Sequence, residues 1–163
     1  MIRQSFQGVT FTNTDISNTK VVAAYVDRFQ TRTDGAGSPG TFTKNFDTNA
    51  NLGSTTLEDG AYTIYVKNNS VDILTLEAQY LDAVDAFSST YLNGEYDLGT
   101  DLNLYTVGQY IGTSYDTTDK SGSIVGLRVG GKLNNLNFKV SVSENSSDGD
   151  VQSGLGYGAD YSL

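Results

Sequence analysis

The chain has 163 residues, a formal net charge of −9, and neither cysteine nor histidine. This composition favours one domain and excludes Cys/His metal sites, thiol nucleophiles and imidazole general bases. A pI near 4.2 argues against nucleic acid as a partner, because phosphates demand a basic surface. No apolar run reaches about 18 residues, so a helical membrane span is excluded as well.

Two strands are predicted before the longest loop, at residues 4–13 and 19–32, with a polar turn at 15–18 between them. In the first strand, Val9 and Phe11 alternate with glycine and threonine. In the second, the residues on one face are Val21, Ala23, Tyr25 and Phe29. On the opposite face are Lys20, Arg28 and Arg32. We expect this alternation from strands that have one apolar and one polar face.

Residues 33–60 form the longest predicted loop and contain the single proline, Pro39. Proline lacks the N–H that a central strand needs, which supports a loop here. Strands resume at 61–68, 74–84 and 88–98. The middle one alternates most regularly, with Leu74, Leu76, Ala78 and Tyr80 against Thr75, Glu77 and Gln79.

The last three predicted strands are 102–113, 123–133 and 137–145, giving about eight in all and no useful helical period. Tight polar turns are expected at one end of the strands and loops of uneven length at the other. Hydrophobic residues make up only 37% of the chain, yet it contains 11 Tyr and 7 Phe. A barrel wall between lipid and water needs apolar side chains only at alternate positions, so the chain predicts an all-β, antiparallel transmembrane β-barrel.

Three segments resemble the OprD-type substrate-specific porins of bacterial outer membranes. Residues 3–13 resemble the start of a family hairpin, with the sequence RQSFQGVTFTN. Residues 74–80, followed by Asp82 and Asp85, are similar to a family strand that ends in an acidic turn. Residues 89–96 resemble the strand after it. The resemblance spans most of the chain but only the middle of a barrel of about eighteen strands.

The resemblance implies an internal barrel segment, residues 1–163, of a passive diffusion channel for small hydrophilic solutes. It places the protein among the lipids of the bacterial outer membrane, with no chemical step, cofactor or metal. Residues 1–4 lead straight into strand-like sequence without a signal peptide, so we expect a mature protein or a piece of a longer one. Related porins often form trimers, which makes a homotrimer of the full-length protein an expectation.

In the family a long loop folds inward and narrows the lumen, and residues 33–60 occupy its place here. The candidates to line that constriction are Lys44, Asp47, Glu58 and Asp59. Charged residues on the polar, lumen-facing side of the alternating strands are candidates to guide solutes. The reason is that a ring of charge in a narrow pore selects ions by sign. These candidates are Lys20, Arg28, Arg32, Glu77, Glu95, Arg128, Lys132 and Lys139. The alternative for each one is an ordinary solvated face, which is the commoner role of a single charge.

Aromatic residues are candidates for membrane girdles, with ordinary cross-strand packing as the alternative. They are Tyr25, Phe29, Tyr62, Tyr80, Tyr96, Tyr110 and Phe138. Calcium binding at 116–119 or 148–150 has too few acids to be favoured. A glycosidase that uses Glu77 and Glu95 on adjacent strands is not favoured, because the sequence gives no evidence of a pocket around them.

Two rival functions remain open from the sequence. A complete eight-stranded barrel would be filled by side chains and would act as a membrane anchor or adhesin. A secreted β-sandwich would bind carbohydrate by stacking exposed tyrosines on sugar rings. The ending at 161–163 lacks the aromatic-ended strand expected of a complete barrel.

Overall fold

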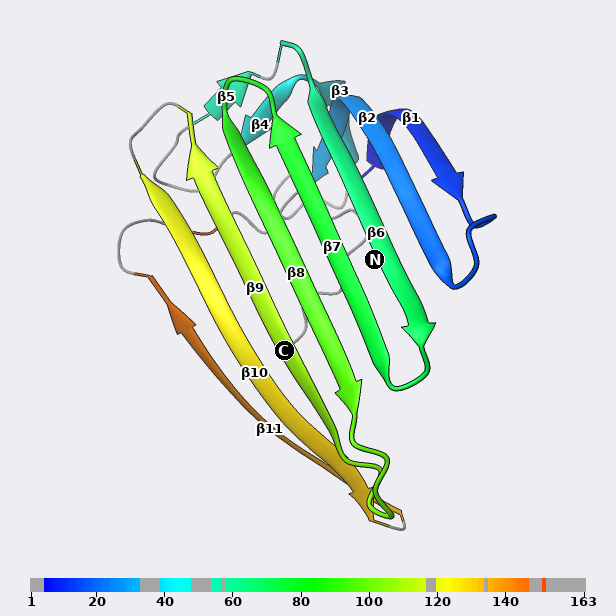
Figure 1. The fold of residues 1–163 in the computed structure, drawn as a ribbon. Helices are drawn as coiled ribbons and strands as arrows, with labels where there is room; N and C mark the ends of the chain where they lie inside the picture. The colour runs from blue at the N-terminus through cyan, green and yellow to red at the C-terminus, as the bar shows by residue number, and fades with distance from the viewer. Residues whose placement is uncertain are drawn as a thin grey trace.

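A computed structural model of the chain describes residues 5–32, 39–47, 54–56, 58–116, 120–133, 135–146 and 151. The elements assigned within these ranges are all β-strands (Figure 1). No helix in this part of the chain is long and apolar enough to cross a bilayer. The all-β class predicted from the alternating pattern is confirmed.

Eight strands form one antiparallel path in which each strand pairs with its neighbours along the path. They are β1 (Ser5–Asn13), β2 (Thr19–Arg32), β6 (Ala61–Val71), β7 (Leu74–Ala83), β8 (Phe87–Asp97), β9 (Tyr105–Tyr115), β10 (Ser121–Leu133) and β11 (Leu136–Asn145). These are the eight strands predicted from the sequence, although β9 begins and ends later than expected.

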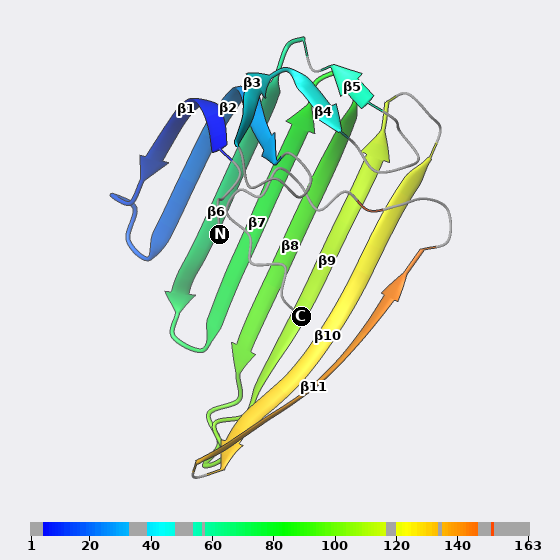
Figure 2. The same ribbon diagram turned by 180° about the vertical axis from the view of Figure 1, so that it is seen from behind.

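The segment between β2 and β6 contains three short strands that the sequence analysis treated as loop. β3 (Pro39–Thr43) pairs with β2 on the side that β6 occupies further down, and it contains Pro39. β4 (Asn45–Asp47) and β5 (Ser54–Thr56) form a separate two-stranded sheet. All three lie at the upper end of the large sheet in Figures 1 and 2.

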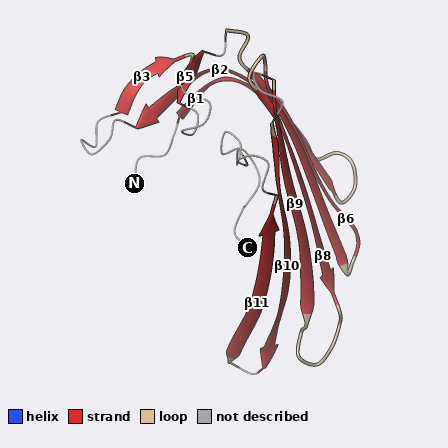
Figure 3. Ribbon diagram, turned by 90° about the vertical axis from the view of Figure 1, so that its left-hand side faces the viewer, coloured by secondary structure: helices blue, strands red, loops and turns tan. Residues whose placement is uncertain are grey.

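The large sheet is strongly curved, and β1, β2 and β3 bend over to one side of the remaining strands (Figure 3). Among the described residues, β1 pairs only with β2, and β11 pairs only with β10. The sheet is therefore an open arc. It is neither the closed eight-stranded barrel nor the two-layer sandwich considered as rivals.

The expected division between short turns and long loops is only partly correct. At the loop end, where β2 connects to β6, the β7–β8 turn is nevertheless tight and is closed by the bond from the Ala86 amide to the Ala83 carbonyl at 2.9 Å. Asp85 takes a positive φ of 59° to make this turn. At the opposite, turn end, the β8–β9 connection at 98–104 is longer and is closed by the bond from the Leu98 amide to the Leu104 carbonyl at 2.8 Å.

The two faces of the sheet differ in chemistry and in burial. On β7, Gln79 is 5% exposed and Leu81 is 2% exposed, whereas the intervening Tyr80 is 46% exposed. Side chains crowd together on the concave side of a curved sheet and spread apart on the convex side. We call the face of Gln79 the inner face and the face of Tyr80 the outer face.

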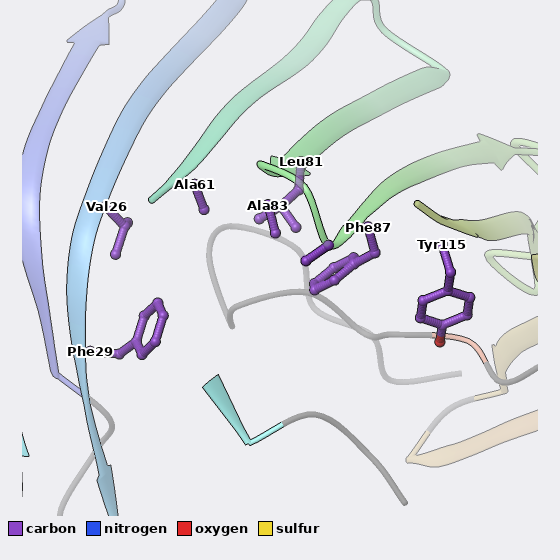
Figure 4. Packing of buried hydrophobic residues seen from close by; sticks show 8 residues of the cluster. Val26, Phe29, Ala61, Leu81, Ala83, Phe87 and Tyr115 are labelled. Atoms are coloured by element: carbon purple, nitrogen blue, oxygen red, sulfur yellow. The ribbon is translucent and has the colours of Figure 1, made fainter. Parts of the chain in front are cut away.

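At the loop end the inner face is apolar. One row of paired residues crosses five strands there: Val26, Ala61, Ala83, Phe87 and Tyr115. Phe29, Leu81 and Ala86 complete the buried cluster (Figure 4). The Phe87 and Tyr115 rings lie 6.3 Å apart at a 54° tilt. This cluster forms a small apolar core on the inner side of the arc.

A β-bulge in β2 overturns two of the predicted positions. Gly8 pairs with Val26 and Gln7 pairs with Arg28, which leaves Asp27 as the extra residue. The bulge reverses the phase beyond it, so Phe29 points inward and is buried in the apolar cluster. The prediction that Phe29 shares the face of Tyr25 is wrong. For the same reason the prediction that Arg28 faces the lumen is wrong, because it lies on the outer face. There its Nε is 3.2 Å from the Asp27 carboxylate.

Candidate functional site

The inner face becomes more polar from the loop end toward the turn end. In the row next to the apolar row lie the buried hydroxyl side chains of Thr63, Ser89 and Thr113. The following row contains Tyr65, Gln79 and Tyr91. All the charged side chains found on the inner face of the eight described strands lie beyond these rows, toward the turn end.

The charged half begins with a row that joins Lys20, Lys67 and Glu77 on three successive strands. The Lys67 ammonium lies 2.9 Å from one oxygen of Glu77, and the Tyr65 hydroxyl donates to the other at 3.0 Å. Only 14% of the Glu77 side chain is exposed, so it is the best-shielded charge for which the structure gives an ion pair. A partly buried carboxylate with two donors has a fixed position on the wall.

Amide side chains continue this hydrogen-bonded layer across the sheet. The Gln79 amide donates to the Thr63 hydroxyl at 3.0 Å, and that hydroxyl donates to the Tyr80 carbonyl at 3.0 Å. The Gln109 amide donates to the Tyr91 hydroxyl at 3.0 Å. Side chains held in this way present a polar and well-ordered surface.

The predicted lumen residues fall into three groups. The inner face has six of them: Lys20, Glu77, Glu95, Arg128, Lys132 and Lys139. Arg28 lies on the outer face. Arg32 belongs to β2 opposite Pro39, and its side chain lies outside what the structure describes.

Two charged inner-face residues were missed by the sequence analysis, Lys67 and Asp97. Lys67 pairs with Glu77, and Asp97 pairs with Tyr105. The alternation of Tyr62, Ile64 and Val66 could have identified Lys67, because it continues the opposite phase. Asp97 is harder to place because the chain turns immediately after it.

The inner face is zoned by charge sign across the strands. The β2 and β6 zone contributes Lys20 and Lys67, and the β7 and β8 zone contributes Glu77, Glu95 and Asp97. The β10 and β11 zone contributes Arg128, Lys132 and Lys139. Basic residues therefore outnumber acidic ones on this face, although the whole chain has a net charge of −9.

The four predicted loop residues are placed unevenly. Lys44 lies between β3 and β4, and its ammonium donates to the Glu58 carbonyl at 2.6 Å. It also lies 3.5 Å from the Asp27 carboxylate. Lys44 therefore links the backbone of Glu58 to the bulge of β2. Glu58 and Asp59 are exposed, and the side chain of Asp47 lies outside the described part.

The outer face has a continuous apolar belt. Its members at mid-strand are between 45% exposed, at Val129, and 74% exposed, at Val140. Others in the belt are Ile64, Leu76, Leu92, Val125, Leu127 and Val142. Exposed apolar area on this scale, on one face only, marks a surface that meets something other than water.

An aromatic band runs along the loop side of this belt. It includes Tyr25 and Tyr62, whose rings lie 4.9 Å apart, and then Tyr80 and Tyr110. On the loop side of the band the outer face turns polar, with Asp82, Ser88, Ser114, Ser123 and Glu144. Tyr96 and Phe138 lie on the turn side of the belt.

The aromatic band is oblique to the strands. The residue of β9 in the same row as Tyr62 is Ser114, four residues beyond Tyr110. Four residues span about 13 Å along a strand, and the three strand spacings from β6 to β9 span about 14 Å. The band is therefore inclined by roughly 45° to the rows of paired residues that run across the strands. This angle is close to the tilt of the strands in membrane barrels.

Comparison with solved structures gives matches of one kind. Pseudomonas aeruginosa OpdO matches with a TM-score of 0.72 and 14% identity, over 89% of this chain and 38% of that one. The fold is that of the OprD-type porins. Acinetobacter baumannii OccAB2 matches with a TM-score of 0.73 and 19% identity, over 88% and 37%. For Pseudomonas aeruginosa OpdQ the values are 0.74 and 13%, over 91% and 41%.

The resemblance to the OprD-type family is thus confirmed for the fold. The chain spans about two fifths of the length of these structures, in keeping with its open sheet. No protein-family model and no curated protein sequence matches it. Of the acidic loop motifs considered for calcium, residues 117–119 and 148–150 lie outside the described residues.

Proposed function

We propose that this chain is part of the wall of a passive diffusion channel for small hydrophilic solutes in the bacterial outer membrane. The observation that carries the proposal is the two-faced sheet, in which one curved layer has an apolar outer belt and a polar inner face. A wall of this kind satisfies its backbone by strand pairing and offers charged side chains only to water.

The placement of charge supports transport rather than anchoring. In a small closed barrel, side chains fill the interior and leave no path. Here the inner face has eight charged side chains on an arc that does not close on itself within the described strands. Charged zones of opposite sign along an aqueous wall sort solutes by charge without a chemical step, so no enzyme activity is proposed.

The direct test is ion conductance of the native protein that contains this chain, reconstituted in planar bilayers. We expect discrete current steps. Replacing Lys20 with Glu should shift the reversal potential in a salt gradient toward cation selectivity, because Lys20 is an exposed inner-face charge. Lys120→Glu, the same change of charge at the loop end, should shift it less.

Absence of conductance from protein shown to be inserted would refute the channel. A reversal potential that Lys20→Glu leaves unchanged would show that the inner face of β2 does not line the path. Liposome swelling with neutral sugars gives an independent measure of solute passage.

A further inference from the structure

At the turn end of the inner face, four strands surround a groove of about 530 Å³. β8 contributes Glu95 and Asp97 to its lining, and β9 contributes Tyr105. β10 and β11 contribute Lys132 and Lys139. Two carboxylates thus line one side of the groove and two ammonium groups line the other.

The row through the middle of the groove sets its width. Asp97 pairs with Tyr105, Tyr105 with Gly130, and Gly130 with Lys139. The backbones of β8 and β11 are therefore three strand spacings apart, about 14 Å. Gly130 has no side chain, and the ring of Tyr105 lies over it, since an added Cβ at Gly130 would be only 2.7 Å from the ring Cε1. The ring of Tyr105 forms a flat floor between the acids and the bases.

The acidic and basic sides of the groove do not neutralise each other. The ion pairs among the described residues involve Asp27 or Glu77, and none joins an acid of this groove to one of its bases. The Asp97 carboxylate accepts a bond from the Gly99 amide at 2.8 Å, which holds it in place. On the other side, the Lys132 amide donates to the Leu102 carbonyl at 2.7 Å and fixes the end of β10.

We propose that this groove is a binding subsite for small solutes with a positive group at one end and a negative group at the other. The cationic end would lie against Glu95 and Asp97 and the anionic end against Lys132 and Lys139, with the linking carbons over Tyr105. The volume is within the usual range for small-molecule sites. The proposal rests on the proposed channel function, because the solute reaches this face from the lumen.

The test uses three probes of equal chain length on the native protein in detergent: 6-aminohexanoate, hexanoate and hexylamine. Binding is followed by amide NMR shifts at Tyr105, Gly131 and Asn137, which line or flank the groove. We expect 6-aminohexanoate to perturb these signals and to bind at least tenfold more tightly than either singly charged probe. Equal affinity for the three probes, or no shifts at these positions, would overturn the proposal.

Variants assign each end of the solute. Glu95→Gln with Asp97→Asn should remove the preference for 6-aminohexanoate over hexanoate. Lys132→Gln with Lys139→Gln should remove the preference over hexylamine. Asp116→Asn and Lys120→Gln, exposed at the loop end, are the matched controls and should change neither preference. If both double variants behave like the controls, the groove is not the site.

This binding experiment is independent of conductance. Selective binding by a protein that passes no current would refute the channel and leave the subsite standing. Conductance without selective binding would refute the subsite alone.

Discussion

Gly60 immediately precedes β6, and its backbone conformation and close neighbours disfavour any side chain there. It has a φ of +74°, and an added Cβ would lie 2.9 Å from the ring Cε2 of Tyr25 and would also meet the Val26 carbonyl oxygen. We expect Gly60→Ala to destabilise the fold by about 1–2 kcal/mol or more, because residues with a Cβ disfavour this conformation. Reversible urea unfolding from phospholipid vesicles measures the change.

The matched control is Gly108→Ala, in the middle of β9. A Cβ at Gly108 would meet nothing within 4 Å. We therefore expect a change of less than about 0.5 kcal/mol. Equal losses for the two variants would mean that the close approach at Gly60 does not constrain the fold.

Glu77 is the residue whose removal should most disturb the inner wall. Glu77→Ala leaves the hydroxyl of Tyr65, a residue only 8% exposed, without its acceptor. The lost hydrogen bond and its desolvation cost about 1–3 kcal/mol. Loss of the ion pair with Lys67 adds little to this loss of stability, because 44% of the Lys67 side chain is exposed to solvent.

The comparison for Glu77→Ala is Glu95→Ala, because Glu95 lies on the same face and is exposed. The same unfolding measurement should find it neutral within about 0.5 kcal/mol. A Glu77→Ala variant that is as stable as the Glu95→Ala variant would show that the hydrogen-bonded layer is not a source of stability.

At the scale of one strand, the apolar belt predicts where a charge is tolerated. Leu92 lies in the belt on the outer face of β8, and Ser88 lies on the same face beyond the aromatic band. Leu92→Arg should destabilise the inserted protein by about 2–4 kcal/mol, and Ser88→Arg by about 0–1 kcal/mol. Unfolding from vesicles distinguishes the two. Equal penalties would contradict the oblique belt.

The strands themselves were largely predictable from the sequence, because period-2 alternation survives in each of the eight. The bulge at Asp27 was not, since it arises from the pairing of Gly8 with Val26 across two strands. An extra residue reverses every later side chain of its strand, which is why the expected positions of Phe29 and Arg28 were exchanged. The strand β3 was not predicted because Pro39 indicated a loop. Pairing at a sheet edge tolerates a proline that a central strand would not.

The candidate site was predictable only in part, for a physical reason. Alternation assigns a face to Lys132 and Lys139, but it does not say which residues of other strands lie beside them. The groove that contains Asp97 and Tyr105 depends on register and on the length of the β8–β9 connection. Register is fixed by pairing across the whole sheet, and a single strand does not encode it.

For the whole molecule, one curved layer separates two environments, and the proposed transport depends on that separation. Because the chain contains no cysteine, single cysteines can be introduced and spin-labelled without interference. The most direct measurement is the accessibility of labels at Leu92, Asn93, Glu95 and Tyr96 of β8, with the protein in vesicles. Labels at Leu92 and Tyr96 should collide mainly with oxygen dissolved in lipid, and labels at Asn93 and Glu95 with a water-soluble nickel complex. Equal access of the nickel complex to all four positions, or the reverse pattern, would contradict a wall between hydrocarbon and water.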